Sequence, residues 1–356
     1  MMIGKLTSLQ TLPFFVVGWD EGQKIEELGS LSKLRGKLMI YNLQWVESRE
    51  EVEKAKILGK PNIRKLGFHW DRVGNPSTAG DITSINHEGV LEGLKSHGNL
   101  KGLKLQNFEG KSFASWMMSG RDAQSLQNLV KIKLSECTRC EQAPPLGHLP
   151  HLEVIKIYSG VVTTATAKAL AVVFPALREI HLEDMLKIEE WCGLGVSSSL
   201  LDTTMFFPLL ESVIIINCLE LTTIPGLFSE ELEYFPWPST TLSAASASAF
   251  TSASTTATAE EEVDDDDTKY HPNPKHYPFI SLVSLTLYGW ERLKYLPDQL
   301  QHLTTLRELS ILWFRGLEAL PGWLGNLSSL HSLELYECQT LMNLPTLEAM
   351  QRLTNL

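Results

Sequence analysis

The sequence predicts an α/β solenoid, a fold in which similar short units stack along one direction. The first observation is a repeat: three apolar residues with the spacing L-x-x-L-x-L return 24 residues later. The second is strand alternation, because residues two apart point to the same face and give each unit one apolar side. The composition, with 43% hydrophobic and 21% charged residues, is ordinary for a soluble globular chain. The repeated residues are Leu306, Leu309 and Ile311, followed by Leu330, Leu333 and Leu335.

A period of this size with this apolar core is typical of a leucine-rich repeat. One such strand cannot bury its apolar side alone, whereas stacked copies bury one another and form a continuous core. We therefore expect a leucine-rich-repeat horseshoe. A parallel β-sheet would line its concave face, and irregular or helical returns would form its convex face.

Eleven copies of the pattern follow one another along the chain, with a further stub at Leu353. Their spacing varies from 23 to 37 residues outside one long interruption, and we expect the extra residues in the returns, where loops tolerate length. The apolar positions are Leu9, Leu12 and Phe14; Leu34, Leu38 and Ile40; Ile63, Leu66 and Phe68; Leu100, Leu103 and Leu105; Leu129, Ile132 and Leu134; Leu152, Ile155 and Ile157; Leu177, Ile180 and Leu182; Leu210, Val213 and Ile215; Leu282, Leu285 and Leu287; and the two copies already named.

Two segments depart from the repeat. Residues 46–60 are rich in helix formers and predict a helical return that ends at Pro61. Residues 238–278 are rich in Ser, Thr and Ala and then acidic, which predicts a disordered insertion. We therefore expect leucine-rich repeats over 1–237 and 279–356, truncated at the C-terminus. The acidic part of the insertion is either a docking tail or a tolerated extension of a return loop.

Charge and hydropathy exclude several classes of partner. The formal net charge is −11, and seven of these charges lie in the acidic tract at 260–267. The sequence shows no basic stripe of the kind that nucleic acid requires. No run approaches the roughly 18 apolar residues of a membrane span. The five cysteines lack the spacing of a disulfide framework, which favours a reducing compartment.

One group of residues has the composition of a zinc site but not its spacing. Cys137 and Cys140 form C-x-x-C, and His148 and His151 follow shortly afterwards. A zinc finger needs about twelve residues between the two pairs, so we expect no metal here. The repeat accounts for Cys137 better, because cysteines recur eight residues after the first leucine of a copy, at the position that closes the turn after the strand. These cysteines are Cys137, Cys218 and Cys338.

Other motifs of catalysis are incomplete. Gly110-Lys111-Ser112 resembles the end of a phosphate loop, but Leu105 stands where that loop needs glycine. The sequence contains no G-x-S-x-G motif. We therefore expect neither an enzyme nor a cofactor.

The strand alternation instead predicts a recognition surface on the concave face. Residues between the core leucines face outward there, and aromatic residues dominate protein interfaces. The opposing interpretation is that a few exposed aromatics occur on any surface. The predicted protein-binding residues are Tyr158, Thr286, Tyr288, Glu308, Ser310, Trp313, Glu334 and Tyr336. Other expected outward residues are Lys104, Lys133, Lys156, His181 and Glu183.

Four stretches connect the chain to a known family. They are IGKLTSLQTLPFFVVG at 3–18, NIRKLGFHW at 62–70, HEGVLEGLKSHGNLKGLKLQNFEGKSFASWM at 87–117 and LSECTRCEQAPPLGHLPHLEVIKI at 134–157. Through them the chain resembles the leucine-rich-repeat region of plant coiled-coil, nucleotide-binding, leucine-rich-repeat disease-resistance proteins, of the resistance-gene-analogue type. Ala114 and Ala143 depart from that pattern, where the family usually has Pro and Leu. The resemblance covers nearly all of the chain apart from 238–278.

The resemblance implies a non-catalytic sensor in an intracellular immune receptor. In that family the repeats sense a pathogen effector or a modified host protein, and they pack on the receptor's own nucleotide-binding domain to keep it inactive. It also implies a cytoplasmic location, with the nucleotide-binding domain N-terminal to Met1. Two alternatives remain open: a general leucine-rich-repeat adaptor, such as a substrate receptor of a ubiquitin ligase, and a decayed receptor fragment.

Overall fold

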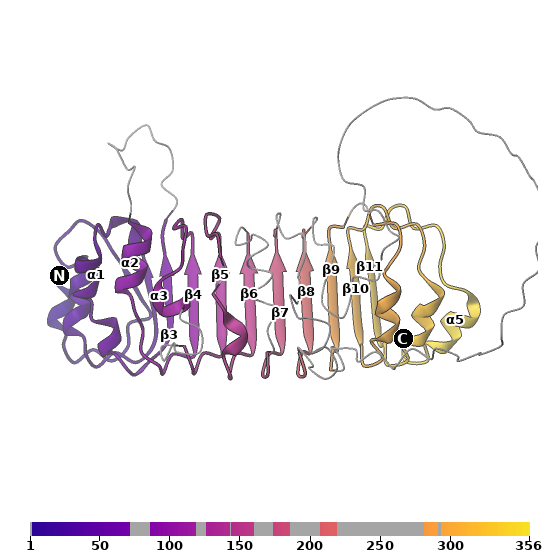
Figure 1. Cartoon of the computed structure of the whole chain (residues 1–356), viewed down its shortest axis with the longest axis horizontal. Coiled ribbons are helices and arrows are strands. Elements are labelled where there is room, and N and C mark those ends of the chain that lie inside the picture. Colours follow the sequence, from indigo (N-terminus) through magenta and orange to yellow (C-terminus); the bar gives the residue numbers. More distant parts are fainter. Residues whose placement is uncertain are drawn as a thin grey trace, which may run out of the picture. The chain divides into compact units, whose positions relative to one another are not determined.

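Eleven parallel strands lie side by side in one sheet, in the order in which they occur along the chain (Figure 1). This arrangement confirms the predicted solenoid with a parallel sheet. The strands are β1 (Phe14–Val16), β2 (Gly36–Tyr41), β3 (Ile63–His69), β4 (Gly102–Gln106), β5 (Lys131–Ser135), β6 (Val154–Tyr158), β7 (Glu179–Glu183), β8 (Ser212–Ile216), β9 (Ser284–Tyr288), β10 (Glu308–Leu312) and β11 (Ser332–Tyr336). The computed structural model describes residues 2–71, 86–118, 126–142, 144–159, 174–185, 207–218, 281–290 and 293–356.

Short helices form the returns between strands. Within the described residues, the α-helices are α1 (Arg49–Glu53), α2 (His87–Gly93), α3 (Ser115–Met118) and α5 (Leu347–Arg352). The 3₁₀ helices are η1 (Ile3–Lys5), η2 (Ile25–Ser30), η3 (Leu43–Trp45), η4 (Ile57–Gly59), η6 (Leu146–His148), η7 (Asp298–His302) and η8 (Gly322–Asn326). Among the described residues, no helix has both the length and the apolar character needed to cross a bilayer.

The core follows directly from the alternation of the strands. From β4 to β10 the second and fourth residues of every strand are aliphatic, and each is at most 2% exposed. Burying one such side chain contributes about 1.5–3 kcal/mol. Leu333 and Leu335 of β11 are only partly buried, because β11 has a paired strand on one side only.

A turn with a left-handed residue ends most strands. The residue after each of nine strands has positive φ, and at the eight strands where the next residue is described, that residue is buried or partly buried against the core. At three strands this second residue is a cysteine, which agrees with the predicted turn-closing position. The thiols of Cys137 and Cys218 donate to the carbonyls two residues earlier, at 3.5 Å and 3.4 Å. The positive-φ residues are Asn42, Asn107, Glu136, Ser159, Asp184, Asn217, Gly289, Trp313 and Glu337.

The register predicted for the first copy is wrong by one residue. We expected Phe14 in the core, but its side chain is 59% exposed, whereas Phe15 and Val17 are buried. In the sheet Phe14 pairs with Met39 and Phe15 pairs with Ile40, which is itself a core residue. The run Phe-Phe-Val-Val suits either register locally, and a slip of one residue moves every side chain to the other face. Pairing with β2 therefore decides which phenylalanine is buried.

The predicted helical return at 46–60 is present but broken. Helix α1 begins after Ser48, whose hydroxyl accepts a hydrogen bond from the N–H of Glu51 at 3.2 Å. Lys56 then adopts positive φ and separates α1 from η4, which ends before Pro61. The predicted insertion at 238–278 lies outside the described residues.

One lysine is buried among the N-terminal returns. Lys60 is 1% exposed, and its Nζ donates to the carbonyl of Leu31 at 3.3 Å. No carboxylate pairs with it among the described residues. Burial, together with the smaller effect of the nearby Lys56 charge, lowers the pKa of this ammonium group to about 8. Its charged form therefore destabilises the folded state.

We expect Leu309→Ala to lower the free energy of unfolding by about 2–5 kcal/mol, because Leu309 is buried between the side chains of its neighbouring repeats. Its neighbour Ser310 points to the other face of the same strand, so Ser310→Ala is the matched control, with an effect within about 0.5 kcal/mol. Urea denaturation followed by circular dichroism measures both. Similar losses for the two variants would contradict the assigned register.

We expect Lys60→Met to stabilise the protein at pH 7, and this advantage to shrink as the pH rises from 8 to 10.5. The folded pKa lies below the unfolded value of 10.5, so the unfolded chain binds the proton more tightly in that window and the cost of Lys60 falls as the pH rises. Denaturant titrations of both proteins at each pH give the difference. The difference between Lys60→Met and the parent chain cancels the effect of the buried thiols on the pH dependence of stability, because these thiols also titrate in alkali. An advantage that did not change with pH would refute this account.

Candidate functional site

The side of the sheet that faces away from the core presents three columns of side chains, which we call the open face. Its members are the first, third and fifth residues of each five-residue strand, and pairing in register places equivalent residues on the same level. Neighbours in a column lie about 4.8 Å apart along the hydrogen-bonding direction. The middle column consists of Phe14, Met39, Gly67, Lys104, Lys133, Lys156, His181, Ile214, Thr286, Ser310 and Glu334.

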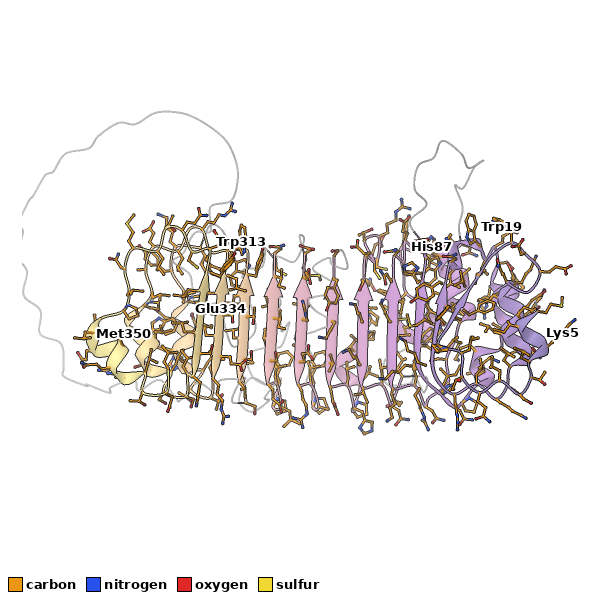
Figure 2. All side chains as sticks on the ribbon, turned by 180° about the vertical axis from the view of Figure 1, so that it is seen from behind. Lys5, Trp19, His87, Trp313, Glu334 and Met350 are labelled. Atoms are coloured by element: carbon orange, nitrogen blue, oxygen red, sulfur yellow. The ribbon has the colours of Figure 1, made fainter. Side chains whose placement is uncertain are left out.

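Six of the eight predicted binding residues lie together on the open face of three adjacent strands. Thr286, Ser310 and Glu334 share one level, and Ser310 Oγ donates to Glu334 Oε2 at 3.1 Å. Figure 2 shows Glu334 on the strands themselves. Tyr158 ends β6, so β7 and β8 separate it from this group. The six residues are Thr286, Tyr288, Glu308, Ser310, Glu334 and Tyr336.

Trp313 does not belong to a strand, in contrast to its predicted place on the concave face. It follows β10 in the turn, at the sheet edge where the strands end (Figure 2). Its φ is 61°, a value that bulky residues rarely adopt. The corresponding residues of the neighbouring repeats are Gly289 and Glu337.

Trp313 joins two tyrosines in a group that we call the aromatic cluster: Tyr288, Trp313 and Tyr336. The ring centroid of Trp313 lies 6.1 Å from that of Tyr288 and 6.4 Å from that of Tyr336. The guanidinium of Arg315 lies 4.8 Å from the Trp313 ring. Tyr336 is 55% exposed. The cluster thus offers broad, partly exposed rings with a cation beside them.

Tyr158 lies in a second group of interacting side chains, across β5 to β7. The ammonium of Lys133 lies 4.0 Å from the centre of the Tyr158 ring. The Tyr158 hydroxyl lies 3.4 Å from Nδ1 of His181, whose Nε2 lies 3.2 Å from a carboxylate oxygen of Glu183. Burial raises the pKa of Tyr158 and lowers the pKa of His181, although Glu183 opposes the shift of His181. These groups bind one another and hold Tyr158 in place.

Cys137, Cys140 and Cys218 are buried in the core. Burial raises the pKa of both Cys137 and Cys218 to about 12, and Cys140 donates to the carbonyl of Gly110 at 3.2 Å. Thiols in such surroundings are poor nucleophiles and poor metal ligands. In the part of the chain that the structure describes, no three His, Cys, Asp or Glu side chains gather in a way that could hold a metal ion.

The sequence analysis missed exposed apolar residues at the first strand. Phe14, Val16 and Trp19 are 59%, 45% and 67% exposed. Phe14 and Val16 were missed because of the register error, and Trp19 because it follows the strand. The signal that could have found them is the run Phe14-Phe15-Val16-Val17, in which one alternate pair must face outward.

Comparison with known proteins places these repeats in context. The family profile described as R13L1/DRL21 LRRs matches residues 25–159 and 298–356. "Disease resistance protein RGA2" of Solanum bulbocastanum is 32% identical over 230 residues, which are 63% of this chain and 22% of that protein. "Putative disease resistance RPP13-like protein 1" of Arabidopsis thaliana is 28% identical over 226 residues, 59% of this chain and 20% of that protein. The chain therefore spans about a fifth of the length of the curated relatives it matches.

The crystal structure of the TLR13-ssRNA13 complex aligns with 96% of this chain and 47% of that chain, with a TM-score of 0.44 and 15% sequence identity.

We expect alkylation of the native protein by iodoacetamide at pH 8 to be slowest at Cys137, Cys140 and Cys218, because their thiols are buried and protonated. Cys338 is only partly buried and should react sooner. Mass spectrometry of tryptic peptides gives the rate at each site, and protein unfolded in urea is the control. Fast labelling of Cys137 in the native protein would contradict the turn-closing role.

Proposed function

The chain belongs to the R13L1/DRL21 leucine-rich-repeat family, and we propose that it is the protein-recognition part of a plant intracellular immune receptor. It acts by binding, without catalysis. Its ligand is a pathogen effector or a modified host protein. The site is the open face together with the turn residue Trp313, and its binding residues are Tyr158, Thr286, Tyr288, Glu308, Ser310, Trp313, Glu334 and Tyr336.

The observation that carries this proposal is the aromatic cluster. Tyrosine, tryptophan and arginine are the residues most enriched among the strong contacts of protein interfaces. Here Tyr288, Trp313, Tyr336 and Arg315 meet at one edge of the sheet.

The curated relatives extend far beyond these repeats, so we extend the proposal to a longer receptor in the cytoplasm. In such a receptor the repeats also contact the nucleotide-binding domain and help to keep it inactive. Recognition and inhibition would then compete for surfaces of one solenoid.

We expect the double variant Trp313→Ala/Tyr336→Ala to weaken partner binding by at least about 30-fold, the equivalent of about 2 kcal/mol. A two-hybrid screen of this chain against libraries of secreted pathogen proteins and of host proteins supplies partners. Isothermal titration with each purified partner then gives the dissociation constant.

The matched control is Met342→Ala/Leu347→Ala, which removes two side chains that are 86% and 75% exposed but lie outside the open face. It should bind like the parent chain. Circular dichroism verifies that both variants fold. If the aromatic variant binds every partner as tightly as the control does, the proposed site is incorrect.

A further inference from the structure

Charge on the open face is divided between its two halves. The outward positions of β2 to β6 hold six lysines and no aspartate or glutamate. We call these residues the lysine field. Its members are Lys37, Lys65, Lys104, Lys131, Lys133 and Lys156.

The other half has the opposite sign. The outward positions of β7 to β11 hold four glutamates and no lysine or arginine. The boundary lies between β6 and β7, where Lys156 pairs with Glu179. Apolar outward residues, including Ile214 and Ile216, lie between the glutamates of β7 and those farther along the sheet. The four glutamates are Glu179, Glu183, Glu308 and Glu334.

Within the part of the chain that is described, only Lys156 of the lysine field forms an ion pair. Lys156 is paired, and Lys133 lies over the Tyr158 ring. Burial lowers the pKa of Lys104, and the charges of Lys133 and Lys37 lower it further. Like charges on adjacent strands destabilise a sheet. An external anion on this half would therefore relieve repulsion that the fold leaves in place.

We propose that the lysine field binds an acidic polypeptide segment, which the glutamates of β7 to β11 confine to this half of the open face by repulsion. The inference rests on the proposed function as a protein-recognition module and adds the chemistry of one partner segment. Four gaps between five strands, at about 4.8 Å each, give a field about 19 Å long. An extended peptide covers that length with about six residues.

The composition of the field favours a polypeptide over nucleic acid. It contains no arginine, the residue whose guanidinium group forms bidentate hydrogen bonds with phosphate and stacks on bases. Single-stranded nucleic acid also needs free aromatic surfaces for stacking. The rings of Tyr41 and His69, 5.2 Å apart, pack against each other, as do those of Tyr158 and His181.

The test is a fluorescence-anisotropy titration at low salt, with hexaglutamate as the labelled probe and hexaglutamine and a six-nucleotide oligothymidylate as comparisons. We expect hexaglutamate to bind and both comparisons to bind at least tenfold more weakly. Lys104→Gln/Lys131→Gln should weaken hexaglutamate binding at least tenfold. The matched control, Lys33→Gln/Lys95→Gln, loses the same charge at exposed positions outside the strands and should change binding less than twofold.

Equal binding by the two lysine variants overturns the proposal, and so does tighter binding of oligothymidylate, which would favour nucleic acid. The titrations are repeated with the acids of the tract at 260–267 replaced by Gln and Asn, so that the chain's own acidic residues cannot compete with the probe. Trp313→Ala/Tyr336→Ala should bind hexaglutamate like the parent chain. One outcome would refute this inference and leave the proposed function intact: neither the parent chain nor its variants bind hexaglutamate, but Trp313→Ala/Tyr336→Ala still weakens binding to protein partners.

Discussion

One backbone hydrogen bond holds the repeats in register. Where a strand ends, the residue of positive φ donates its N–H to the carbonyl of the last residue in the next strand. This bond measures 3.0 Å from Asn107 to Ser135 and 2.7 Å from Trp313 to Tyr336, and it recurs at each strand between them. It fixes the level at which each of these strands stops. The inward leucines therefore meet one another, and the outward residues form straight columns.

The columns give the face properties that no single repeat possesses. Each strand contributes two or three outward side chains, but pairing in register brings Lys104, Lys133 and Lys156 side by side. The same rule gathers Tyr288 and Tyr336 around Trp313. A ligand on such a surface contacts residues from several neighbouring strands. The chemistry of the surface therefore depends on the spacing of the repeats rather than on any local motif.

Periodicity predicted the strands because a leucine pair two residues apart suits few other structures. It predicted the outward position of Tyr158 and Glu334 for the same reason. It could not place Phe14, since four apolar residues in a row satisfy both registers until β2 selects one. Nor could it place Trp313, whose backbone N–H forms a hydrogen bond with β11 in the turn after β10. The pattern also did not predict the division of charge on the open face. Lys37, Lys65 and Lys131 lie on the same half of that face, which is apparent only after repeats of unequal length are aligned.

The pairing of β11 with β10 has a consequence for how the sheet responds to a ligand. In a stack held by nearest neighbours, each strand is stabilised by the strands beside it, and in this structure β11 pairs with β10. The aromatic cluster takes Trp313 from the turn after β10 and Tyr336 from β11. A ligand that contacts both residues would link this pair of strands. The free energy of binding would then include the free energy of ordering β11 against β10.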